Sequence, residues 1–414
     1  MSDVKTKNKR AAMAMVASML LASLMIGVLS SIHASILPLA SQALPLGLPE
    51  RIGDFALAPF SMILSSGLTG LVLAVLPATL SRKKTLLAGL LLITLATLFA
   101  VFARTPFELV CWSFLCGIGW TMHFCAWISI GANYFPRHCA MVVACMNFVT
   151  TAGGIAAPQL TAIILAPHDQ RKALLLPGLI GLLVLAFLFI LIMHLFQRLS
   201  VADKRRLIRP DAMGLAPTLW SRGPLLLCLA AIGVPLVTYG MSVSYATYLR
   251  EAMGLSLKTA NLMIGMFVLA NLLSPLGAWL GDRHGTFKVL LIVLPITGAL
   301  GGLMFMGWDI PLPVIMLTAF LTGVGVHSVF YVNVQAALIT SLAPAQSMRA
   351  VGLFCAAYSL FLPIAGVLLM RMQSATSWKE IALLQIVGPL FLATLLVWLA
   401  QHTLRSRDKA VAFD

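Results

Sequence analysis

The chain has 414 residues, of which 60% are hydrophobic and only 10% are charged. A soluble protein needs more polar side chains than this to cover its surface, so the composition excludes an ordinary soluble domain and indicates that lipid is the main solvent. The formal net charge of +15 is also unusual. Its distribution decides whether it reflects nucleic-acid binding or membrane topology.

A dozen apolar stretches follow one another along the chain, each close to the about 20 residues that a helix needs to cross the hydrocarbon core. Helices are expected because backbone polar groups in lipid must be satisfied within the protein, whereas a β-barrel would show shorter alternating segments. The first stretch is too long for the apolar part of a signal peptide. The expected spans are 11–40, 53–79, 84–103, 107–131, 139–166, 173–197, 224–248, 259–281, 288–307, 312–338, 347–370 and 380–402.

Lys and Arg residues are unevenly distributed between the loops. If the N-terminus is cytoplasmic, 20 of the 28 Lys and Arg residues fall in cytoplasmic segments and eight on the opposite side. This excess follows the positive-inside rule, so we expect both termini in the cytoplasm and a location in the bacterial inner (plasma) membrane. The positive charge therefore indicates orientation, and no nucleic-acid partner is expected.

The longest polar segment, residues 197–223, divides the chain into two halves. It carries six basic residues together with Pro210 and Pro217, which is typical of a linker. The halves share landmarks: Phe-Leu-Cys-Gly-Ile-Gly at 114–119 returns as Phe-Leu-Thr-Gly-Val-Gly at 320–325, which predicts an internal repeat. The expected domains are a cytoplasmic tail (1–10), an N-terminal six-helix bundle (11–197), a cytoplasmic linker (198–223), a C-terminal six-helix bundle (224–403) and a second cytoplasmic tail (404–414).

The loop between the eighth and ninth spans carries the most specific motif. Its sequence over 277–285, Gly-Ala-Trp-Leu-Gly-Asp-Arg-His-Gly, is followed by Lys288. This segment resembles the conserved loop motif of the major facilitator superfamily, G-x-x-x-D-R-x-G-R-K, with Thr286 and Phe287 in place of the usual basic pair. The counterpart in the first half, residues 77–84, keeps a basic cluster and lacks the acidic residue and the central glycine.

This resemblance implies an all-α fold of about twelve transmembrane helices in two pseudo-symmetric six-helix bundles that work by alternating access. It also implies a gating motif made of Asp282, Arg283, Gly285 and Lys288. We expect Asp282 to bond to Arg283 or Arg349, or to cap the start of the eleventh span, and so to stabilise the outward-facing state.

Polar side chains inside the apolar spans are the candidates for a solute site. In the tenth span His327, Tyr331 and Gln335 fall at i, i+4 and i+8, which predicts that they share one helix face. Similar groups occur in the first, fourth and seventh spans, and in the superfamily that the chain resembles these four helices line the central cavity. The predicted substrate-binding residues are His33, His123, Thr238, Tyr239, Ser242, Tyr245, His327, Tyr331, Asn333 and Gln335.

Three residues are candidates for ion coupling. Histidine is the side chain that ordinarily changes charge near neutral pH, so His123 and His327 are candidates for proton transfer or the binding of an anion. Each histidine alone can equally be a packing residue that bonds to a neighbouring helix. Asp54 is an acidic residue that can lie inside a span, although helix capping near the membrane surface is an alternative role for it.

The sequence therefore predicts a secondary active transporter of a small organic solute, with an organic anion among the candidates and protons as the candidate coupling ion. A transporter of a metal chelate, a siderophore or a drug is one alternative, and a non-transporting membrane sensor on the same fold is another. Enzyme motifs are absent from the sequence, so no enzymatic activity, cofactor or metal site is expected. The expected partners are a small molecule and membrane lipid, and the expected state is a monomer.

Overall fold

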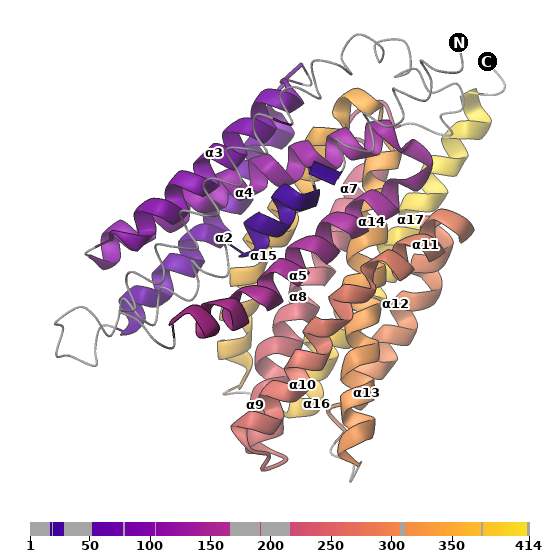
Figure 1. The fold of residues 1–414 in the computed structure, drawn as a ribbon. Helices are drawn as coiled ribbons and strands as arrows, with labels where there is room; N and C mark the ends of the chain where they lie inside the picture. The colour runs from indigo at the N-terminus through magenta and orange to yellow at the C-terminus, as the bar shows by residue number, and fades with distance from the viewer. Residues whose placement is uncertain are drawn as a thin grey trace. The chain divides into compact units, whose positions relative to one another are not determined.

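The computed structural model describes residues 17–18, 20–28, 52–77, 79–103, 105–165, 191, 216–306, 311–373 and 376–411. These residues are almost entirely helical, and within them ten helical segments are long and apolar enough to cross a membrane. The all-α prediction is therefore confirmed (Figure 1). The first expected span lies partly, and the sixth almost wholly, outside the described residues.

The helices of the first half begin with residues 17–18 and 20–28. The helices that follow are α2 (Ile52–Val75), α3 (Arg82–Val101), α4 (Pro106–Tyr134), the 3-10 turn η2 (Pro136–His138) and α5 (Cys139–Leu165).

Most spans of the second half are built from several shorter helical segments in direct succession. These are α7 (Arg222–Ala231), α8 (Gly233–Tyr239), η3 (Gly240–Ser244), α9 (Tyr245–Glu251), α10 (Leu257–Leu269), η4 (Ala270–Leu273), α11 (Ser274–His284), α12 (Thr286–Leu303), α13 (Leu312–Gly323), η5 (Val324–Tyr331), α14 (Val332–Thr340), η6 (Pro344–Gln346), α15 (Ser347–Gln373), α16 (Trp378–Ala382), η7 (Leu383–Val387) and α17 (Gly388–Val411).

Local capping residues explain where several helices start. Ser81 accepts a hydrogen bond from the Lys84 backbone N–H at 3.4 Å, which satisfies an otherwise unpaired donor in the first turn of α3. Ser377 and Glu380 form a reciprocal capping box at the start of α16. Pro106 opens α4, a position where its missing N–H costs no hydrogen bond.

The described residues form two compact units, and each is described by itself. Unit 1 comprises those within Met1–Tyr134 and Val149–Pro210, and unit 2 those within Phe135–Phe148 and Asp211–Asp414. The predicted linker 198–223 lies mostly outside the described residues, so the predicted domain boundaries stay predictions.

In unit 1, α4 packs along both α2 and α3 (Figure 1). Hydroxyl groups fix the contact between α2 and α4: Ser66 Oγ donates to the Gly117 carbonyl, and Thr121 Oγ1 donates to the Ser66 carbonyl, each at 3.1 Å. Such hydrogen bonds hold helices together in lipid, where hydrophobic attraction between helices is weak. The helix pair α2–α4 therefore forms a fixed framework.

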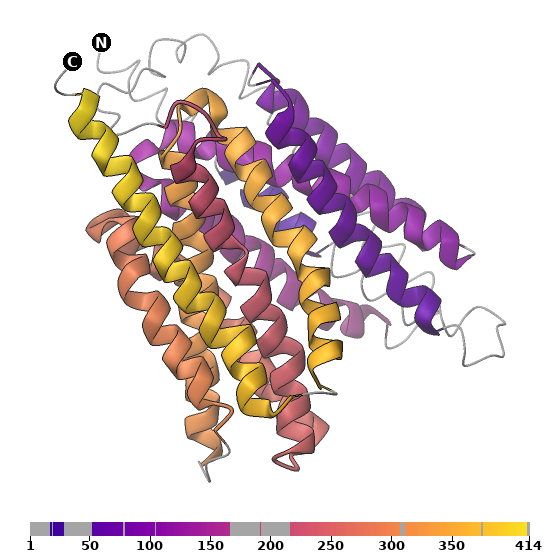
Figure 2. The same cartoon turned by 180° about the vertical axis from the view of Figure 1, so that it is seen from behind.

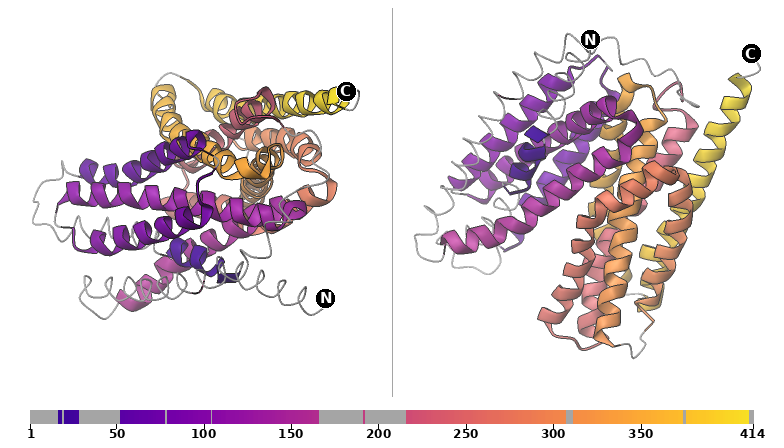
Figure 3. Two further views of the ribbon diagram at one scale, coloured as in Figure 1. Left: turned by 90° about the horizontal axis from the view of Figure 1, so that it is seen from above. Right: turned by 45° about the vertical axis from the view of Figure 1, so that its right-hand side comes forward.

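In unit 2, α12 packs against α13 and α17, and α10 packs against α13. The salmon and orange helices α10 to α13 lie together in Figures 1 and 3, and Figure 2 shows the yellow α17 beside the rose α7. Before α7, the Ala216 N–H donates to the Ser341 carbonyl at 2.8 Å, which ties the segment that leads into α7 to the end of α14.

The repeated sequence segments make the same contact in each unit. A Cβ atom at Gly117 on α4 would meet the backbone carbonyl oxygen of Met62 on α2, and one at Gly323 on α13 would meet that of Phe267 on α10. The two glycines are 206 positions apart and their partners 205. A glycine is required at both positions because the neighbouring backbone leaves no room for a side chain.

We expect Gly117→Ala to lower the melting temperature of the purified protein, because overpacking of this kind costs about 1–3 kcal/mol. Gly265→Ala is the matched control, since nothing lies within 4 Å of a Cβ atom built at that exposed helical position. Thermal unfolding in detergent measures both variants. Equal melting temperatures for Gly117→Ala and Gly265→Ala would contradict the close approach of α2 and α4.

Candidate functional site

Three spans of unit 2 contain a π-helical segment: η3 in the seventh span, η5 in the tenth and η7 in the twelfth. π-helical turns are rare and frequently occur at functional sites. Two of these segments carry predicted site residues, Ser242 in η3 and both His327 and Tyr331 in η5. A buried hydrogen bond from Ser244 Oγ to Gln385 Oε1 joins η3 to η7.

The widened turn of η5 sends its polar side chains toward different neighbours. The His327 ring lies edge-on against Phe267 of α10, with 4.7 Å between ring centroids. The Tyr331 ring instead packs edge-on against Phe354 and Tyr358 of α15, at 5.1 and 5.8 Å. Within the tenth span, His327 therefore contacts α10 and Tyr331 contacts α15, and their common role in a solute site stays a prediction.

Asn333 lies fully buried on α14 and serves the contact between helices. Its Nδ2 donates to the Gly277 carbonyl of α11 at 3.1 Å and to the Val329 carbonyl at 2.9 Å. A Cβ atom at Gly281 would meet Asn333 Oδ1, so α11 approaches this side chain closely. The amide thus ties the tenth span to the helix that carries the loop motif.

Other predicted residues of unit 2 place polar atoms in the interior without a hydrogen-bond partner among the described residues. These atoms are Thr238 Oγ1, the Tyr245 hydroxyl and both polar atoms of the Gln335 amide group. Gln335 is 0% exposed. Tyr245 packs against Phe305 with ring centroids 5.1 Å apart. Buried polar atoms without a protein partner call for a bound water or ligand.

Two further tyrosines of unit 2, Tyr239 and Tyr358, are half-buried. Tyr239 on α8 brings its hydroxyl close to Gly366 of α15, since a Cβ atom there would lie 2.8 Å from it. Tyr358 on α15 forms the edge-on pair with Tyr331 and was not among the predicted residues. A tyrosine inside an apolar span is a signal of a functional residue, but this one lies in the eleventh span. The predicted residues came from the first, fourth, seventh and tenth spans.

In unit 1, His123 lies buried on α4. Its Nε2 is 3.2 Å from Ser23 Oγ of the first span, while its Nδ1 and the Trp127 Nε1 have no partner among the described residues. His33 lies outside the described residues. Asp54 lies on α2, and its side chain also falls outside what the structure describes.

Asp282 of the loop motif caps a helix of the first half. Its Oδ1 accepts from the Ala140 N–H at 3.2 Å and its Oδ2 from the Met141 N–H at 3.1 Å. Both donors belong to the first turn of α5, where backbone N–H groups lack helical partners and a negative charge is favourable. The capped helix is thus the fifth span, and the expected cap on the eleventh span was wrong.

A second polar contact continues along the same pair of helices. Asn147 Nδ2 of α5 donates to Asn271 Oδ1 at 3.0 Å and to Ser274 Oγ at 2.9 Å. None of these three residues was predicted from the sequence, although an amide inside an apolar span is itself a signal of a helix–helix contact. Together with Asp282, these residues tie the start of α5 to the eighth span over two helical turns.

The other motif residues shape the loop. The Arg283 guanidinium lies over the Trp279 ring, 5.1 Å from its centroid. Gly285 has a φ of +92°, which favours glycine, and it separates α11 from α12. Lys288 is exposed on the first turn of α12. No group of three or more His, Cys, Asp or Glu side chains suited to a metal ion occurs in the described part of the chain.

Comparisons with known proteins agree on one family. The family model described as Major Facilitator Superfamily matches residues 19–274 and 227–412. The gallate transporter of Pseudomonas putida is 28% identical over 297 residues, which cover 62% of this chain. The match covers 64% of that relative, which is less than two thirds of its length.

Solved structures share the fold over nearly the whole chain. A bacterial homologue of the iron transporter ferroportin in the outward-facing state has a TM-score of 0.72 at 17% identity, with 94% of this chain and 99% of that chain covered. The Escherichia coli fucose:proton symporter FucP has a TM-score of 0.68 at 16% identity, covering 93% and 98%. The proton:xylose symporter XylE has a TM-score of 0.65 at 14% identity, covering 95% of each chain.

We expect Asp282→Asn to speed hydrogen exchange at the Ala140 and Met141 amides, because an uncharged cap binds these N–H groups less strongly. Hydrogen exchange of the full-length protein in detergent, followed by mass spectrometry, measures this. Glu251→Gln is the control, since it removes an exposed carboxylate at the end of α9. Unchanged exchange in the Asp282→Asn protein would contradict the capping role.

Proposed function

Because the chain belongs to the Major Facilitator Superfamily, we propose that it is a secondary transporter that moves a small organic anion across the bacterial inner membrane by alternating access. The distribution of Lys and Arg favours an orientation with both termini in the cytoplasm. Sequence similarity to the gallate transporter supports an aromatic carboxylate as the transported class.

The observation that carries this proposal is a set of buried polar atoms in the seventh and tenth spans that have no hydrogen-bond partner within the described part of the chain, at Thr238, Tyr245 and Gln335. In an apolar bundle such atoms are costly unless water or a solute binds them. A purely structural pair of helices would place apolar side chains there at no such cost. These three residues are therefore proposed to hydrogen-bond the solute or the water around it.

The aromatic pair Tyr331 and Tyr358 suits a planar solute. Both side chains are half-buried, so each ring keeps part of its surface available while the edge-on contact fixes its orientation. An aromatic carboxylate can pack against such rings, and the Tyr358 hydroxyl is able to donate to a carboxylate or to ring hydroxyls. Gallate is an aromatic carboxylate of this kind.

We further propose that protons drive the transport. His123 and His327 are buried inside spans, and imidazole is the side chain that changes charge near neutral pH. Protonation of either ring would supply the positive charge that an anionic solute requires in an apolar site. The proposed gate consists of the motif residues Asp282, Arg283, Gly285 and Lys288. In this gate the Asp282 cap on α5 biases the balance between the outward-facing and inward-facing states.

We expect the purified protein in proteoliposomes to take up labelled gallate. Tyr358→Leu should raise the KM for gallate about tenfold, because loss of an aromatic contact costs about 0.5–1.5 kcal/mol and loss of a hydrogen bond costs a similar amount. Tyr134→Leu is the control for loss of a tyrosine, because Tyr134 is the last residue of α4 and is not among the residues proposed for solute binding. Absence of uptake for every aromatic carboxylate tested would overturn the substrate class.

The pH dependence of uptake tests the histidines. His327→Gln and His123→Gln are expected to reduce uptake and to flatten its profile between about pH 5 and 8, because neither variant gains a charge in that range. His402→Gln, on α17 beside Trp398, is the matched control and should keep the wild-type profile. If both site variants keep that profile as well, the site is neutral and the coupling role is lost.

A further inference from the structure

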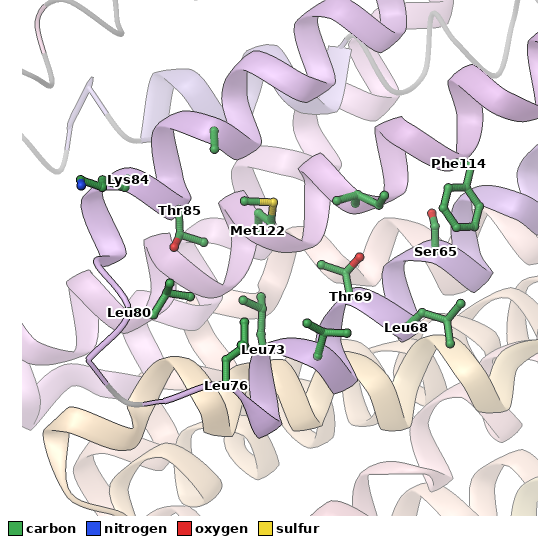
Figure 4. Close-up of a pocket in the computed structure, with 13 residues that line it drawn as sticks. Ser65, Leu68, Thr69, Leu73, Leu76, Leu80, Lys84, Thr85, Phe114 and Met122 are labelled. Carbon is green, nitrogen blue, oxygen red and sulfur yellow. The ribbon is translucent and has the colours of Figure 1, made fainter.

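A groove of about 520 Å³ runs along the surface of unit 1. Its walls come from α2 and α3, and its floor comes from α4, which packs against both helices (Figure 4). Leu68, Val72 and Leu76 line the α2 side, and all three side chains are exposed. Since none of the residues proposed for solute binding lines this groove, it is a separate feature of the molecule.

The groove has one apolar end and one charged end. In Figure 4, Phe114 and Ser65 lie at one end of the row of lining residues, and Lys84 lies at the other. Lys84 is exposed on the first turn of α3 and is the lining residue that carries a charge. A long apolar surface that ends in a single cation matches the chemistry of an amphiphile with a negatively charged head.

The length of the groove matches one leaflet of a bilayer. Its lining residues on the α2 side run from Ser65 to Leu76, which corresponds to roughly 17 Å at the helical rise of 1.5 Å per residue. One leaflet contributes about half of the roughly 30 Å hydrocarbon core. An acyl chain lying in the groove would therefore reach from the middle of the membrane to its surface.

The basic residues beside Lys84 place its end of the groove at the membrane surface. Arg82 and Lys83 precede Lys84 in the first turn of α3, and charged side chains at helix ends lie at the level of the lipid headgroups. The fixed α2–α4 contact through Ser66 and Gly117 keeps the floor and one wall in place without a ligand.

We propose that this groove binds one acyl chain of an anionic phospholipid, with the lipid phosphate against Lys84. The apolar side chains along α2 and α4 hold the chain, and the ammonium group selects a negatively charged headgroup. This lipid site depends on the groove and its charge alone, so it can be tested independently of the proposed transported solute.

Native mass spectrometry of the full-length protein tests the proposal with phosphatidylglycerol and phosphatidylcholine of identical acyl chains. The wild-type protein should retain phosphatidylglycerol in preference to phosphatidylcholine. Lys84→Gln should weaken phosphatidylglycerol binding about fivefold, the equivalent of about 1 kcal/mol for one basic residue near an anionic surface. Ala88→Phe fills the groove and should weaken binding of both lipids.

Lys83→Gln is the matched control, because it removes the same charge one residue away and does not line the groove. It should leave phosphatidylglycerol binding within twofold of wild type, a limit that corresponds to about 0.4 kcal/mol. An equal loss in Lys83→Gln and Lys84→Gln would overturn the site in favour of non-specific attraction to the basic cluster. Undiminished binding in Ala88→Phe, or displacement of the lipid by gallate, would overturn it as well.

Discussion

Each polar atom inside a bilayer has to find its partner in the protein or in a bound water or solute, because lipid offers none. Helices meet this requirement for the backbone, and side chains meet it by bonding to the neighbouring helix. Ser66 and Thr121 do so between α2 and α4, and Asn147 does so between α5 and the eighth span. The polar positions therefore decide which helices touch and in which register.

The same requirement made much of the fold predictable. A charged or polar side chain is so costly in lipid that the spans stand out as uninterrupted apolar runs, and ten of the twelve expected spans correspond to helices in the described residues. Repeated glycines were informative for a related reason. Gly117 and Gly323 mark places where two helices approach too closely for any side chain, and such places are fixed by the fold of each half.

The site was less predictable because it depends on departures from ideal helices and on distant contacts. The π-helical turn at Val324–Tyr331 has no signature in residue spacing, and residue spacing does not reveal that His327 packs against Phe267 of α10 and Tyr331 against Phe354 of α15. The partner of Asp282 lies 142 positions earlier in the chain, and no local pattern connects the two. Tyr358 was not predicted because it lies on the eleventh span, outside the four spans that line the central cavity in the superfamily.

The cap on α5 also has a consequence for how the protein is made. A ribosome that adds about 5–20 residues per second reaches Asp282 about 7 to 28 s after it has placed Ala140, because the two are 142 residues apart. During that interval the first turn of α5 has already been synthesised and lacks its carboxylate. Until α11 has followed α5 into the membrane, those amides can be satisfied only by water or lipid headgroups.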